Sequence, residues 1–476
     1  MKYRCKICGY VVEGSLPEDY VCPICGAKHD AFEQEIEEVS KRIPISLDNP
    51  SIERIMNRCI NCGRCKTVCE DIVGIHYDYE KALSPVCVNC GQCVLNCPTG
   101  ALVPKSCYRK VLDYLHDTSK IVVISTAPAV RVSLGEAFGL EDGSFVEGQM
   151  VSALKKLGFD YVFDITFGAD LTIMEEAAEL VKRLKNHEVV PQFTSCCPSW
   201  VKYVEMYHPK LFPHISTCKS PIGMQSAMIK SYLSDYLEVD VEDIINVVVA
   251  PCTAKKYEVL REELGHDTDF LITTSELALM IKELEIPFTE LSDESFDKLL
   301  GLGSGAGLIF GSTGGVMEAS LRTAYHYLTG ENTPENFISY ESLHGMEDVK
   351  TATIRLGDKD LHVAVIQGLS NTEMFIEEAL NGKSKYDFIE VMNCRGGCSG
   401  GGGQILGSIG KMSNARAARA NKLYQIDREK DLRLSYENKE IIEAYRSYLK
   451  EPLSDVAMEL LHTTYQDKSA ILGEDL

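Results

Sequence analysis

The chain reads Phe193-Thr-Ser-Cys-Cys-Pro-Ser-Trp200 directly after an apolar, strand-like run. Two later stretches repeat this arrangement: Pro251-Cys-Thr-Ala-Lys-Lys-Tyr-Glu258 and Glu390-Val-Met-Asn-Cys-Arg-Gly-Gly-Cys-Ser-Gly-Gly-Gly-Gly403. In open α/β sheets the carboxyl ends of the strands converge on the binding crevice. We therefore expect the cysteines of the three stretches to meet at one site, because isolated buried cysteines would explain one such stretch but not three.

The sequence around these stretches alternates short β-branched runs with amphipathic helices from about Lys120 onward. Strands are predicted at 121–125, 161–165, 244–249, 363–366 and 388–391, and helices at 151–157 and 173–184. This alternation is typical of an α/β domain with largely parallel strands. After Ser413 the sequence is charged and predicts helices to its end.

Length, charge and cysteine content bound the class of protein. The chain has 476 residues, 45% of them apolar, which is enough for two or more domains with at least one large core. Its net charge of −22 argues against nucleic-acid binding, which requires a basic face. The sequence has no apolar signal segment and no apolar run near the roughly 20 residues that span a bilayer. We therefore predict a cytoplasmic protein without membrane contact, whose 19 cysteines indicate metal ligation rather than disulfides.

Four cysteines near the N-terminus form two pairs, each with a two-residue gap: Cys5, Cys8, Cys22 and Cys25. The spacing predicts one tetrahedral four-thiolate site, which suits zinc as well as a single iron ion. A structural zinc ribbon therefore stays open as an alternative. The sequences Cys-Gly-Tyr at 8–10 and Cys-Pro-Ile-Cys-Gly-Ala at 22–27, with Phe32 and Glu33 behind them, resemble rubredoxin in its short form and imply iron.

Eight further cysteines form a doubled run, Cys59-x2-Cys62-x2-Cys65-x3-Cys69 and Cys87-x2-Cys90-x2-Cys93-x3-Cys97-Pro98. This is the pattern of bacterial two-cluster ferredoxins, in which the fourth cysteine of each run ligates the other cluster. One 4Fe–4S cluster is therefore predicted on Cys59, Cys62, Cys65 and Cys97, and the other on Cys87, Cys90, Cys93 and Cys69. Their predicted role is electron transfer.

The order of these segments predicts three domains. A rubredoxin-like domain covers 1–38, and a linker that contains Pro44 and Pro50 covers 39–50. A small α+β domain of the bacterial ferredoxin type follows at 51–110. The α/β domain with the three cysteine stretches covers 118–476.

The three cysteine stretches closely resemble the signature motifs of the iron-only (FeFe) hydrogenases. The resemblance runs from about Ile45 to Tyr465 and includes Thr126-Ala-Pro-Ala-Val-Arg131, Phe167-Gly-Ala-Asp-Leu-Thr-Ile-Met-Glu-Glu176, Gly311-Ser-Thr-Gly-Gly-Val-Met-Glu-Ala319 and Leu461-His-Thr463. It implies the two-lobed fold of that family, with parallel sheets. It also implies the reversible reduction of protons to H2 with electrons relayed through iron–sulfur clusters.

The resemblance implies a catalytic H-cluster, in which a 4Fe–4S centre is joined to a diiron unit with CO, cyanide and a bridging dithiolate amine. The residues that match its ligands are Cys197, Cys252, Cys394 and Cys398, and Cys398 matches the thiolate shared by the two parts. Lys255 matches a lysine that holds a cyanide ligand, and Met392 matches a methionine near the bridging CO. The implied partners are H2 and protons, a soluble electron carrier such as ferredoxin or a rubredoxin-type protein, and the maturation proteins that make the diiron unit.

Glu176, Glu179 and Arg183 lie at i, i+3 and i+7, which places them on one face of a predicted helix. On the sequence alone, such a stripe is more often a solvated set of salt bridges. The resemblance implies instead a proton relay that runs through Cys196, Glu176, Ser216, Glu179 and Arg183. In this relay Cys196 is a free thiol beside a metal ligand.

Three positions depart from the best-known members of the family. Ala250 stands where they often have methionine, Ala129 where a serine often contacts a cyanide, and Ile222 where a polar residue is usual. These changes put the rate and the inhibitor sensitivity in doubt, but not the metal content. Cys107 and Cys218 match no ligand position, and we expect each to be a small buried hydrophobic residue.

Two glycine-rich segments need a physical explanation. Gly400–Gly403 would permit close approach of the backbone to a bulky group. Gly311, Gly314 and Gly315 precede a predicted helix, whose N-terminus could bind an anion. Close packing beneath the metal site explains these three glycines better.

Two other functions compete with that of an enzyme. The first is a hydrogen or redox sensor with the same cofactor and low turnover, against which the complete relay and the added electron-entry domain argue. The second is an iron–sulfur assembly protein of the same ancestry, against which Cys196, Cys197, Trp200 and Lys255 argue. The sequence shows no convincing nucleotide-binding segment, so we do not expect this chain alone to reduce NAD.

Overall fold

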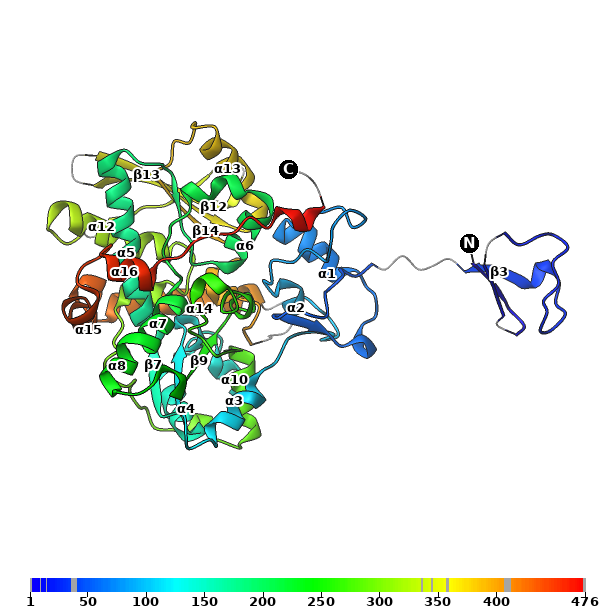
Figure 1. Cartoon of the computed structure of the whole chain (residues 1–476), viewed down its shortest axis with the longest axis horizontal. Coiled ribbons are helices and arrows are strands. Elements are labelled where there is room, and N and C mark those ends of the chain that lie inside the picture. The colour runs from blue at the N-terminus through cyan, green and yellow to red at the C-terminus, as the bar shows by residue number, and fades with distance from the viewer. Residues whose placement is uncertain are drawn as a thin grey trace. The chain divides into compact units, whose positions relative to one another are not determined.

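The computed structural model describes residues 2–8, 10–13, 15–35, 41–334, 337–343, 346–356, 359–405 and 412–473 (Figure 1). The chain forms two compact units, residues 1–43 together with 61–63 and the remaining residues. The predicted linker begins at residues 39 and 40, which lie outside the described residues.

The N-terminal unit is built on a three-stranded antiparallel sheet with the order β2-β1-β3. Its strands are β1 (Lys2–Cys5), β2 (Val11–Glu13) and β3 (Phe32–Glu35). Its small core contains Cys5, Cys22 and Phe32, and Tyr20 meets the ring of Phe32 edge to face. With so little apolar material, this unit depends on a bound metal for its stability.

The second unit opens with a segment of short strands and helices, at the position predicted for a ferredoxin-like domain. Strands β4 (Ile52–Arg54) and β5 (Leu102–Pro104) pair antiparallel. Between them lie four short helices, η2 (Met56–Arg58), α1 (Arg64–Thr67), the π-helix η3 (Val68–Val73) and α2 (Gln92–Leu95). Helix α3 (Tyr108–Leu115) then leads into the large α/β part of the unit.

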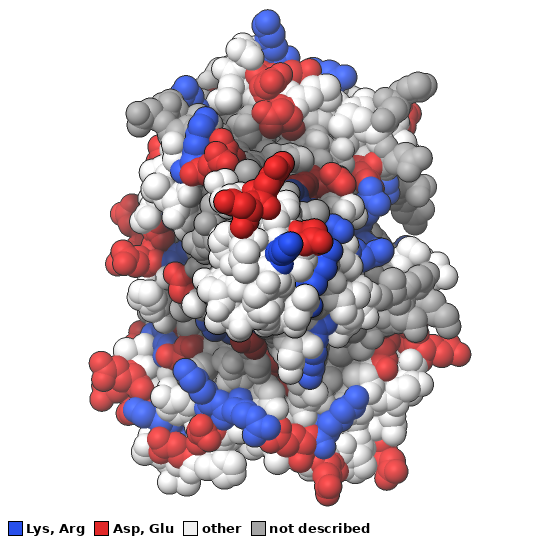
Figure 2. All heavy atoms as spheres, turned by 90° about the vertical axis from the view of Figure 1, so that its right-hand side faces the viewer, with Lys and Arg blue, Asp and Glu red and all other residues white. Residues whose placement is uncertain are grey.

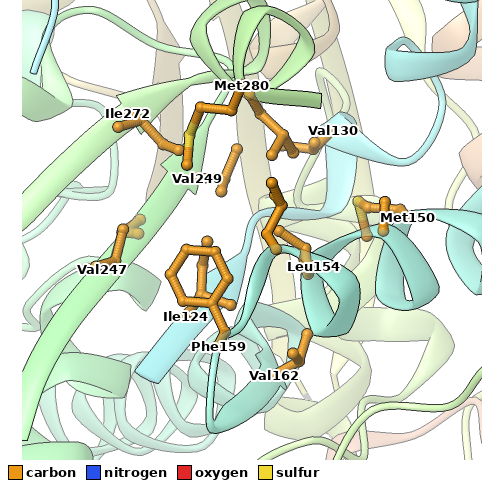
Figure 3. Close-up of a cluster of buried hydrophobic side chains, with 14 of the residues drawn as sticks. Ile124, Val130, Met150, Leu154, Phe159, Val162, Val247, Val249, Ile272 and Met280 are labelled. Atoms are coloured by element: carbon orange, nitrogen blue, oxygen red, sulfur yellow. The ribbon is translucent and has the colours of Figure 1, made fainter. Parts of the chain in front are cut away.

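The first sheet of that part has four strands, all parallel, in the order β10-β9-β6-β7. They are β6 (Ile121–Thr126), β7 (Tyr161–Asp164), β9 (Ile244–Ala250) and β10 (Phe270–Thr273). Side chains from β6 and β9 pack with helices α4 (Glu147–Leu157) and α10 (Thr274–Glu283) in the core drawn in Figure 3. The three strands predicted here, at 121–125, 161–165 and 244–249, are confirmed.

The second sheet has five strands in the order β11-β12-β13-β14-β8 and is mixed. Strands β11 (Glu341–Leu343), β12 (Met346–Leu356) and β13 (Lys359–Gln367) pair antiparallel. Strands β14 (Phe388–Met392) and β8 (Gln192–Phe193) continue from β13 in parallel. The predicted parallel arrangement therefore holds for the whole first sheet. In the second sheet it holds for β13, β14 and β8, and the last two of these strands precede cysteines of the predicted site.

Helix α5 (Ile165–Asn186) connects the two sheets. Its first turn is capped by Asp164, whose carboxylate accepts a hydrogen bond of 2.9 Å from the backbone N–H of Thr166. Phe167 and Leu171 pack in a core with helix α7 (Pro221–Met228), whereas Leu180 packs against β12 and β13 with helix α12 (Gly315–Thr329). Most of α5 is therefore buried, including its polar residues.

The C-terminal part contains helices α14 (Met412–Glu429), α15 (Lys439–Ala444) and α16 (Asp455–Leu461), and a final turn η15 (Ser469–Leu472). The prediction of helices to the end is wrong for residues 462–468, which are largely extended (red in Figure 1). Their backbone bonds to other segments instead: Thr463 donates to Thr217 and Lys468 to Glu205, each at 2.8 Å. Leu83 of the ferredoxin-like segment donates to the carbonyl of Ile471 at 3.0 Å.

Within the described residues, the structure contains no helix with the length and apolar character needed to cross a bilayer. Figure 2 shows acidic and basic side chains scattered among uncharged ones over one face of the molecule.

Candidate functional site

A mostly apolar cavity lies where the ends of strands from both sheets come together. Its lining includes Cys197, Cys252, Cys394 and Cys398, the four cysteines that match the H-cluster ligands. It holds about 80 Å³ of space for the centres of water molecules, several times what one water requires. Among the described lining residues, Lys255 carries the one charged side chain.

Three of these four cysteines follow the end of a strand, and the fourth lies in the turn after the last of them. Cys252 comes two residues after β9 of the first sheet, and Cys394 comes two residues after β14 of the second. Cys197 follows β8 and stands at the N-terminus of helix α6 (Pro198–Tyr207), and Cys398 lies in the turn 397–400. The expectation that the three stretches meet is confirmed, with the addition that they come from two different sheets.

The chemistry of these thiols fits an iron–sulfur cluster. Burial raises the pKa of Cys252 to about 11 and that of Cys398 to about 12. A thiolate is therefore stable at these positions only when a positive metal centre compensates its charge. Four such sulfurs around one apolar cavity are a suitable donor set for a 4Fe–4S centre.

The glycines near the cavity serve contacts within the protein. A Cβ on Gly401 would lie 2.2 Å from the carbonyl oxygen of Pro251, and one on Gly402 would lie 2.4 Å from that of Cys90. The expected close approach is therefore to neighbouring backbone rather than to a bulky ligand. The N-terminus of α12 is occupied by the chain's own carboxylate, because Glu390 accepts hydrogen bonds from the N–H groups of Gly314 and Met317 at 2.7 and 2.8 Å. This excludes the alternative of an external anion there.

Lys255 and Met392 both line the cavity. The ammonium group of Lys255 donates to the carbonyl oxygen of Cys196 at 3.1 Å and forms an ion pair of 2.7 Å with Glu258. Ser220 holds the same carboxylate oxygen of Glu258 at 2.9 Å. Although burial opposes the charge of Lys255, Glu258 outweighs it and the pKa of Lys255 is raised. Lys255 is thus a positive charge fixed at the cavity wall.

The three positions that depart from the best-known family members also line this cavity: Ala129, Ile222 and Ala250. All three are buried and apolar. None can donate a hydrogen bond from its side chain to a group in the cavity. The structure therefore locates the departures beside the bound group, where they would alter its surroundings without touching the cysteines.

The predicted relay residues lie beside and behind the cavity, and all except the half-buried Cys196 are buried. Ser216 donates to Glu179 at 3.0 Å, and Arg183 donates to the other carboxylate oxygen of Glu179 at 2.6 Å. Ser216 also acts on Glu176, because its hydroxyl opposes the rise in the pKa of that carboxyl. Cys196 lines the cavity, and the nearby Glu176 contributes to raising its pKa. The set thus extends from the cavity to Arg183.

Burial of these residues contradicts the interpretation as a solvated salt-bridge stripe. Glu176 is 1% exposed, and Glu179 and Arg183 are each 7% exposed. Burial, and secondly the charge of Glu179, raises the pKa of Glu176 to about 8. Burial, followed by the charge of Glu176, raises the pKa of the Cys196 thiol well above its ordinary value. At neutral pH both groups therefore hold protons, as members of a proton relay must.

The second cysteine run of the ferredoxin-like segment contacts the cavity wall. Gln92, between Cys90 and Cys93, donates to the sulfur of Cys394 at 3.1 Å and to the carbonyl oxygen of Gly400 at 3.0 Å. Thr253 donates to the carbonyl oxygen of Asn89 at 2.7 Å. A cluster held by this run would therefore lie close in space to the cavity cysteines, with Gln92 in contact with Cys394 between them.

Four thiols of this segment are electrostatic neighbours. Burial first, then the charges of Cys90 and Cys87, raise the pKa values of Cys69 and Cys93, and Cys65 of the other predicted cluster makes a smaller contribution to both. This supports the predicted cluster on Cys87, Cys90, Cys93 and Cys69. Cys62 belongs to the segment 61–63 that is grouped with the N-terminal unit, so the cluster on Cys59, Cys62, Cys65 and Cys97 stays a prediction from spacing.

The N-terminal unit brings its four cysteines together. The sulfurs of Cys5, Cys8, Cys22 and Cys25 all lie within 4.8 Å of one another, with 3.6 Å between Cys5 and Cys25 and 3.4 Å between Cys8 and Cys22. A tetrahedral ion with metal–sulfur bonds of about 2.3 Å separates its sulfurs by roughly 3.8 Å. The arrangement fits one metal ion, and exposed Ile7 and Ile24 flank the two exposed cysteines.

Several residues of the site carry no signal in the sequence. Gln92, Glu258 and Ser320 contact Cys394, Lys255 and Glu176, respectively. Gln92 and Ser320 lie 302 and 144 positions from their partners, so no local spacing could have indicated them. Cys218 is buried as expected, whereas Cys107 is half-buried and lies 3.1 Å from the carbonyl oxygen of Leu271.

Three protein-family models match this chain. Residues 120–402 match the C-terminal domain of the iron-only hydrogenase large subunit, residues 413–468 match the iron hydrogenase small subunit, and residues 3–33 match the rubredoxin-like domain of rubrerythrin.

Individual proteins of similar sequence and structure carry related names. The chain is 43% identical over 442 residues to the NADP-reducing hydrogenase subunit HndD of Solidesulfovibrio fructosivorans, covering 87% of this chain and 74% of that protein. It is 40% identical over 432 residues to iron hydrogenase 1 of Clostridium pasteurianum, covering 86% of this chain and 75% of that protein. A solved structure of a variant of the [FeFe]-hydrogenase HydA1 from Chlamydomonas reinhardtii superposes with a TM-score of 0.67 at 39% identity, covering 76% of this chain and 98% of the other.

Proposed function

Because this chain belongs to the family of iron-only (FeFe) hydrogenases, we propose that the cavity cysteines and the buried acids behind them are its catalytic machinery. The protein is an oxidoreductase that catalyses 2H⁺ + 2e⁻ ⇌ H2, with electrons passed through iron–sulfur clusters. The observation that carries the assignment of the site is the meeting of Cys197, Cys252, Cys394 and Cys398 at one apolar cavity beside a buried acid chain. The reaction needs electrons and protons at the same place, and a cluster site beside a chain of buried acids would supply both.

The cofactors are an H-cluster, two 4Fe–4S clusters and one ion in the N-terminal four-cysteine site. The H-cluster supplies the metal centre at which protons and electrons combine. We assign its protein ligands to the four cavity cysteines. In this proposal Lys255, which Glu258 holds in the cavity wall, would donate a hydrogen bond to a cyanide ligand, and Met392 in the same wall would lie near the bridging CO.

The relay assigned to the chain starts at the Cys196 thiol and ends at Arg183. Cys196 would exchange a proton with the group bound in the cavity, and Glu176 would hold the next proton. The Ser216 hydroxyl would connect Glu176 to Glu179. Arg183 anchors Glu179 and also donates to the carbonyl oxygens of Val189, Pro213 and Ile215. Because these bonds fix Arg183, Glu179 keeps one oxygen directed at Ser216.

The electron path and the partners follow from the order of the domains. The domains at 1–38, 51–110 and 118–476, with a linker at 39–50, are assigned to electron entry, electron transfer and catalysis. The proposed electron carrier is a soluble protein of the ferredoxin or rubredoxin type, because Ile7 and Ile24 expose an apolar surface beside Cys8 and Cys25. We also infer that separate maturation proteins supply the diiron unit and that the enzyme works in the cytoplasm.

Two measurements on the anaerobically purified protein test the proposed function. Infrared spectroscopy should show bands of metal-bound CO and cyanide, and a gas assay should show H2 formation with a reduced dye. Absence of the infrared bands from fully matured protein would remove the cofactor assignment. Infrared bands of CO and cyanide without H2 formation would instead support the alternative function of a hydrogen or redox sensor.

The raised pKa of Glu176 predicts a pH dependence of both rate and stability. Its ordinary pKa is 4.5 and its pKa in the folded protein is about 8, so the folded chain holds a proton that the unfolded chain releases between these values. The resulting stability is fully present below about pH 4.5 and is lost as the pH rises toward 8. H2 evolution should fall over the upper end of this range, because an ionised Glu176 has no proton to pass on.

The variant Glu176→Gln is the reference for the pH dependence of stability, because its amide does not titrate. Wild-type melting temperature should fall relative to this variant as the pH rises from about 5 to about 8. If the melting temperatures of the two proteins change equally with pH over this range, the raised pKa of Glu176 is contradicted.

Removal of residues 1–38 should change H2 evolution driven by a small artificial reductant by less than about twofold. Such a reductant can feed the ferredoxin-like clusters directly, because they lie between the first domain and the catalytic domain in chain order. Turnover with the native protein carrier should fall if the four-cysteine site is its docking point. The matched control is full-length Cys8→Ser, which keeps the chain length but loses a predicted metal ligand.

Metal analysis of residues 1–38 within the native protein completes this test. A red, reducible single-iron spectrum is expected. Zinc as the sole metal of the four-cysteine site would make it a structural module, and its electron-entry role would then be abandoned.

A further inference from the structure

A second group of potential metal ligands lies beside the relay, away from the cavity cysteines. Glu179, Cys218 and His462 each offer one ligand atom, all three atoms lie within 4.8 Å of one another, and all three residues are buried. The sulfur of Cys218 is 3.9 Å from Glu179 Oε2. None of the assigned cofactors uses Cys218 or His462.

The backbone holds this group rigidly. Cys218 and His462 face each other in an antiparallel bridge between the segment after Ser216 and the extended C-terminal segment. Hydrogen bonds of 2.8 Å flank the bridge on both sides, from Lys219 to the carbonyl of Leu461 and from Thr463 to that of Thr217. The two side chains therefore keep their positions without a metal, as a preformed binding site requires.

The imidazole of His462 is oriented in the way that metal-binding histidines usually are. Its Nε2 lies 3.1 Å from Glu175 Oε2, and Glu175 in turn accepts hydrogen bonds from Tyr445 at 2.6 Å and from the N–H of Leu453 at 2.8 Å. A carboxylate on one ring nitrogen fixes the tautomer and makes the other nitrogen a better ligand. The other nitrogen, Nδ1, is 2.7 Å from the hydroxyl of Thr217, which lies 3.4 Å from Glu179 Oε2.

From this arrangement we propose that Glu179 Oε2, Cys218 Sγ and His462 Nδ1 form a binding site for a divalent transition metal of the zinc class. One thiolate, one imidazole and one carboxylate are ligands that zinc accepts in tetrahedral geometry, and a water or the Thr217 hydroxyl completes the four. Binding exchanges the thiol proton of Cys218 for the metal ion and releases it to solvent. The charges also balance: Glu179, Cys218 and Glu175 are negative, Arg183 is positive, and a divalent ion brings the sum to zero.

The consequence for turnover rests on the proposed function. A metal on Glu179 Oε2 takes the oxygen that accepts the hydrogen bond of Ser216. The relay is then interrupted at Glu179, its fourth member counted from the cavity. Zinc is therefore expected to inhibit the enzyme without touching its iron–sulfur clusters.

The test uses the full-length holoenzyme, dialysed anaerobically against chelator-buffered Zn²⁺. The wild type should bind one more zinc per chain than Cys218→Ala, and zinc X-ray absorption should show one sulfur with nitrogen or oxygen ligands. The control Cys107→Ala should bind like the wild type. A second variant, His462→Gln, should also lose this zinc, which guards against misfolding of the first.

Inhibition is measured relative to the zinc-free rate of each protein. The zinc concentration for half inhibition should rise at least about tenfold in Cys218→Ala, because removing a ligand costs at least as much affinity as removing a residue that supports one. Equal zinc binding by the wild type and both variants, or a sulfur-only zinc signal, would overturn the proposed site. Zinc bound with one sulfur but without inhibition would leave the site standing and overturn the relay through Glu179.

Discussion

Cys196→Ser is expected to lower hydrogen evolution by about 10²- to 10⁴-fold while leaving the clusters assembled. Serine is nearly the same size as cysteine, so the packing of this position against Ile173 and Met392 should survive. Its hydroxyl is a far weaker acid than a thiol, and the position must release a proton in every turnover. The loss should therefore appear in the rate and not in the iron content or in the infrared bands of CO and cyanide.

The matched control is Cys107→Ser, because Cys107 also matches no ligand position and does not line the cavity. Its hydrogen evolution should stay close to the wild-type rate. A Cys196→Ser enzyme with near-normal evolution would sink the role of this thiol, and the first proton carrier would then have to be sought among the other lining residues.

Glu179→Gln is the second large effect, with an expected loss of about 10²-fold or more in hydrogen evolution. The amide keeps the shape of the side chain, but it cannot take up and release a proton. Ser216, Thr217 and Arg183 all donate to this carboxylate in the wild type. The measurement is the evolution rate with a reduced dye, together with iron content and melting temperature.

Stability has to be followed in this variant, because removing one partner of a buried ion pair typically costs about 3–5 kcal/mol. Arg183 retains its three carbonyl partners, so we expect the cost to lie below this range. The exposed Glu188→Gln, just beyond the end of α5, is the control and should alter neither property. If Glu179→Gln folds normally and turns over at the wild-type rate, protons reach the cavity by another route.

The sequence predicted those parts of the site that depend on local spacing or on strand ends. Three of the strands around the cavity, β6, β9 and β14, stand where the β-branched runs indicated. The convergence of Cys197, Cys252 and Cys394 followed from the general behaviour of parallel strands. The N-terminal four-cysteine group followed from the two-residue gaps alone.

The burial of Glu176, Glu179 and Arg183 could not be predicted in the same way. A stripe at i, i+3 and i+7 looks the same on a solvated helix and on an encased one. What buries α5 is the packing of α7, α12 and the second sheet around it, all of them distant in sequence. The extended course of residues 462–468 was missed for the same reason, because their hydrogen bonds go to Thr217 and Glu205 rather than along a helix.

The C-terminal segment matches a family model named for a small subunit, yet here it is joined covalently to the rest. It supplies Asp427 to the buried Arg322, Tyr445 to Glu175, and His462 to the group beside the relay. Were it a separate chain, these contacts would obey mass action and be lost on dilution. As part of one chain, the segment has an effective concentration that is set by its covalent link to the rest. The surroundings of the relay therefore assemble at a rate that does not depend on the protein concentration.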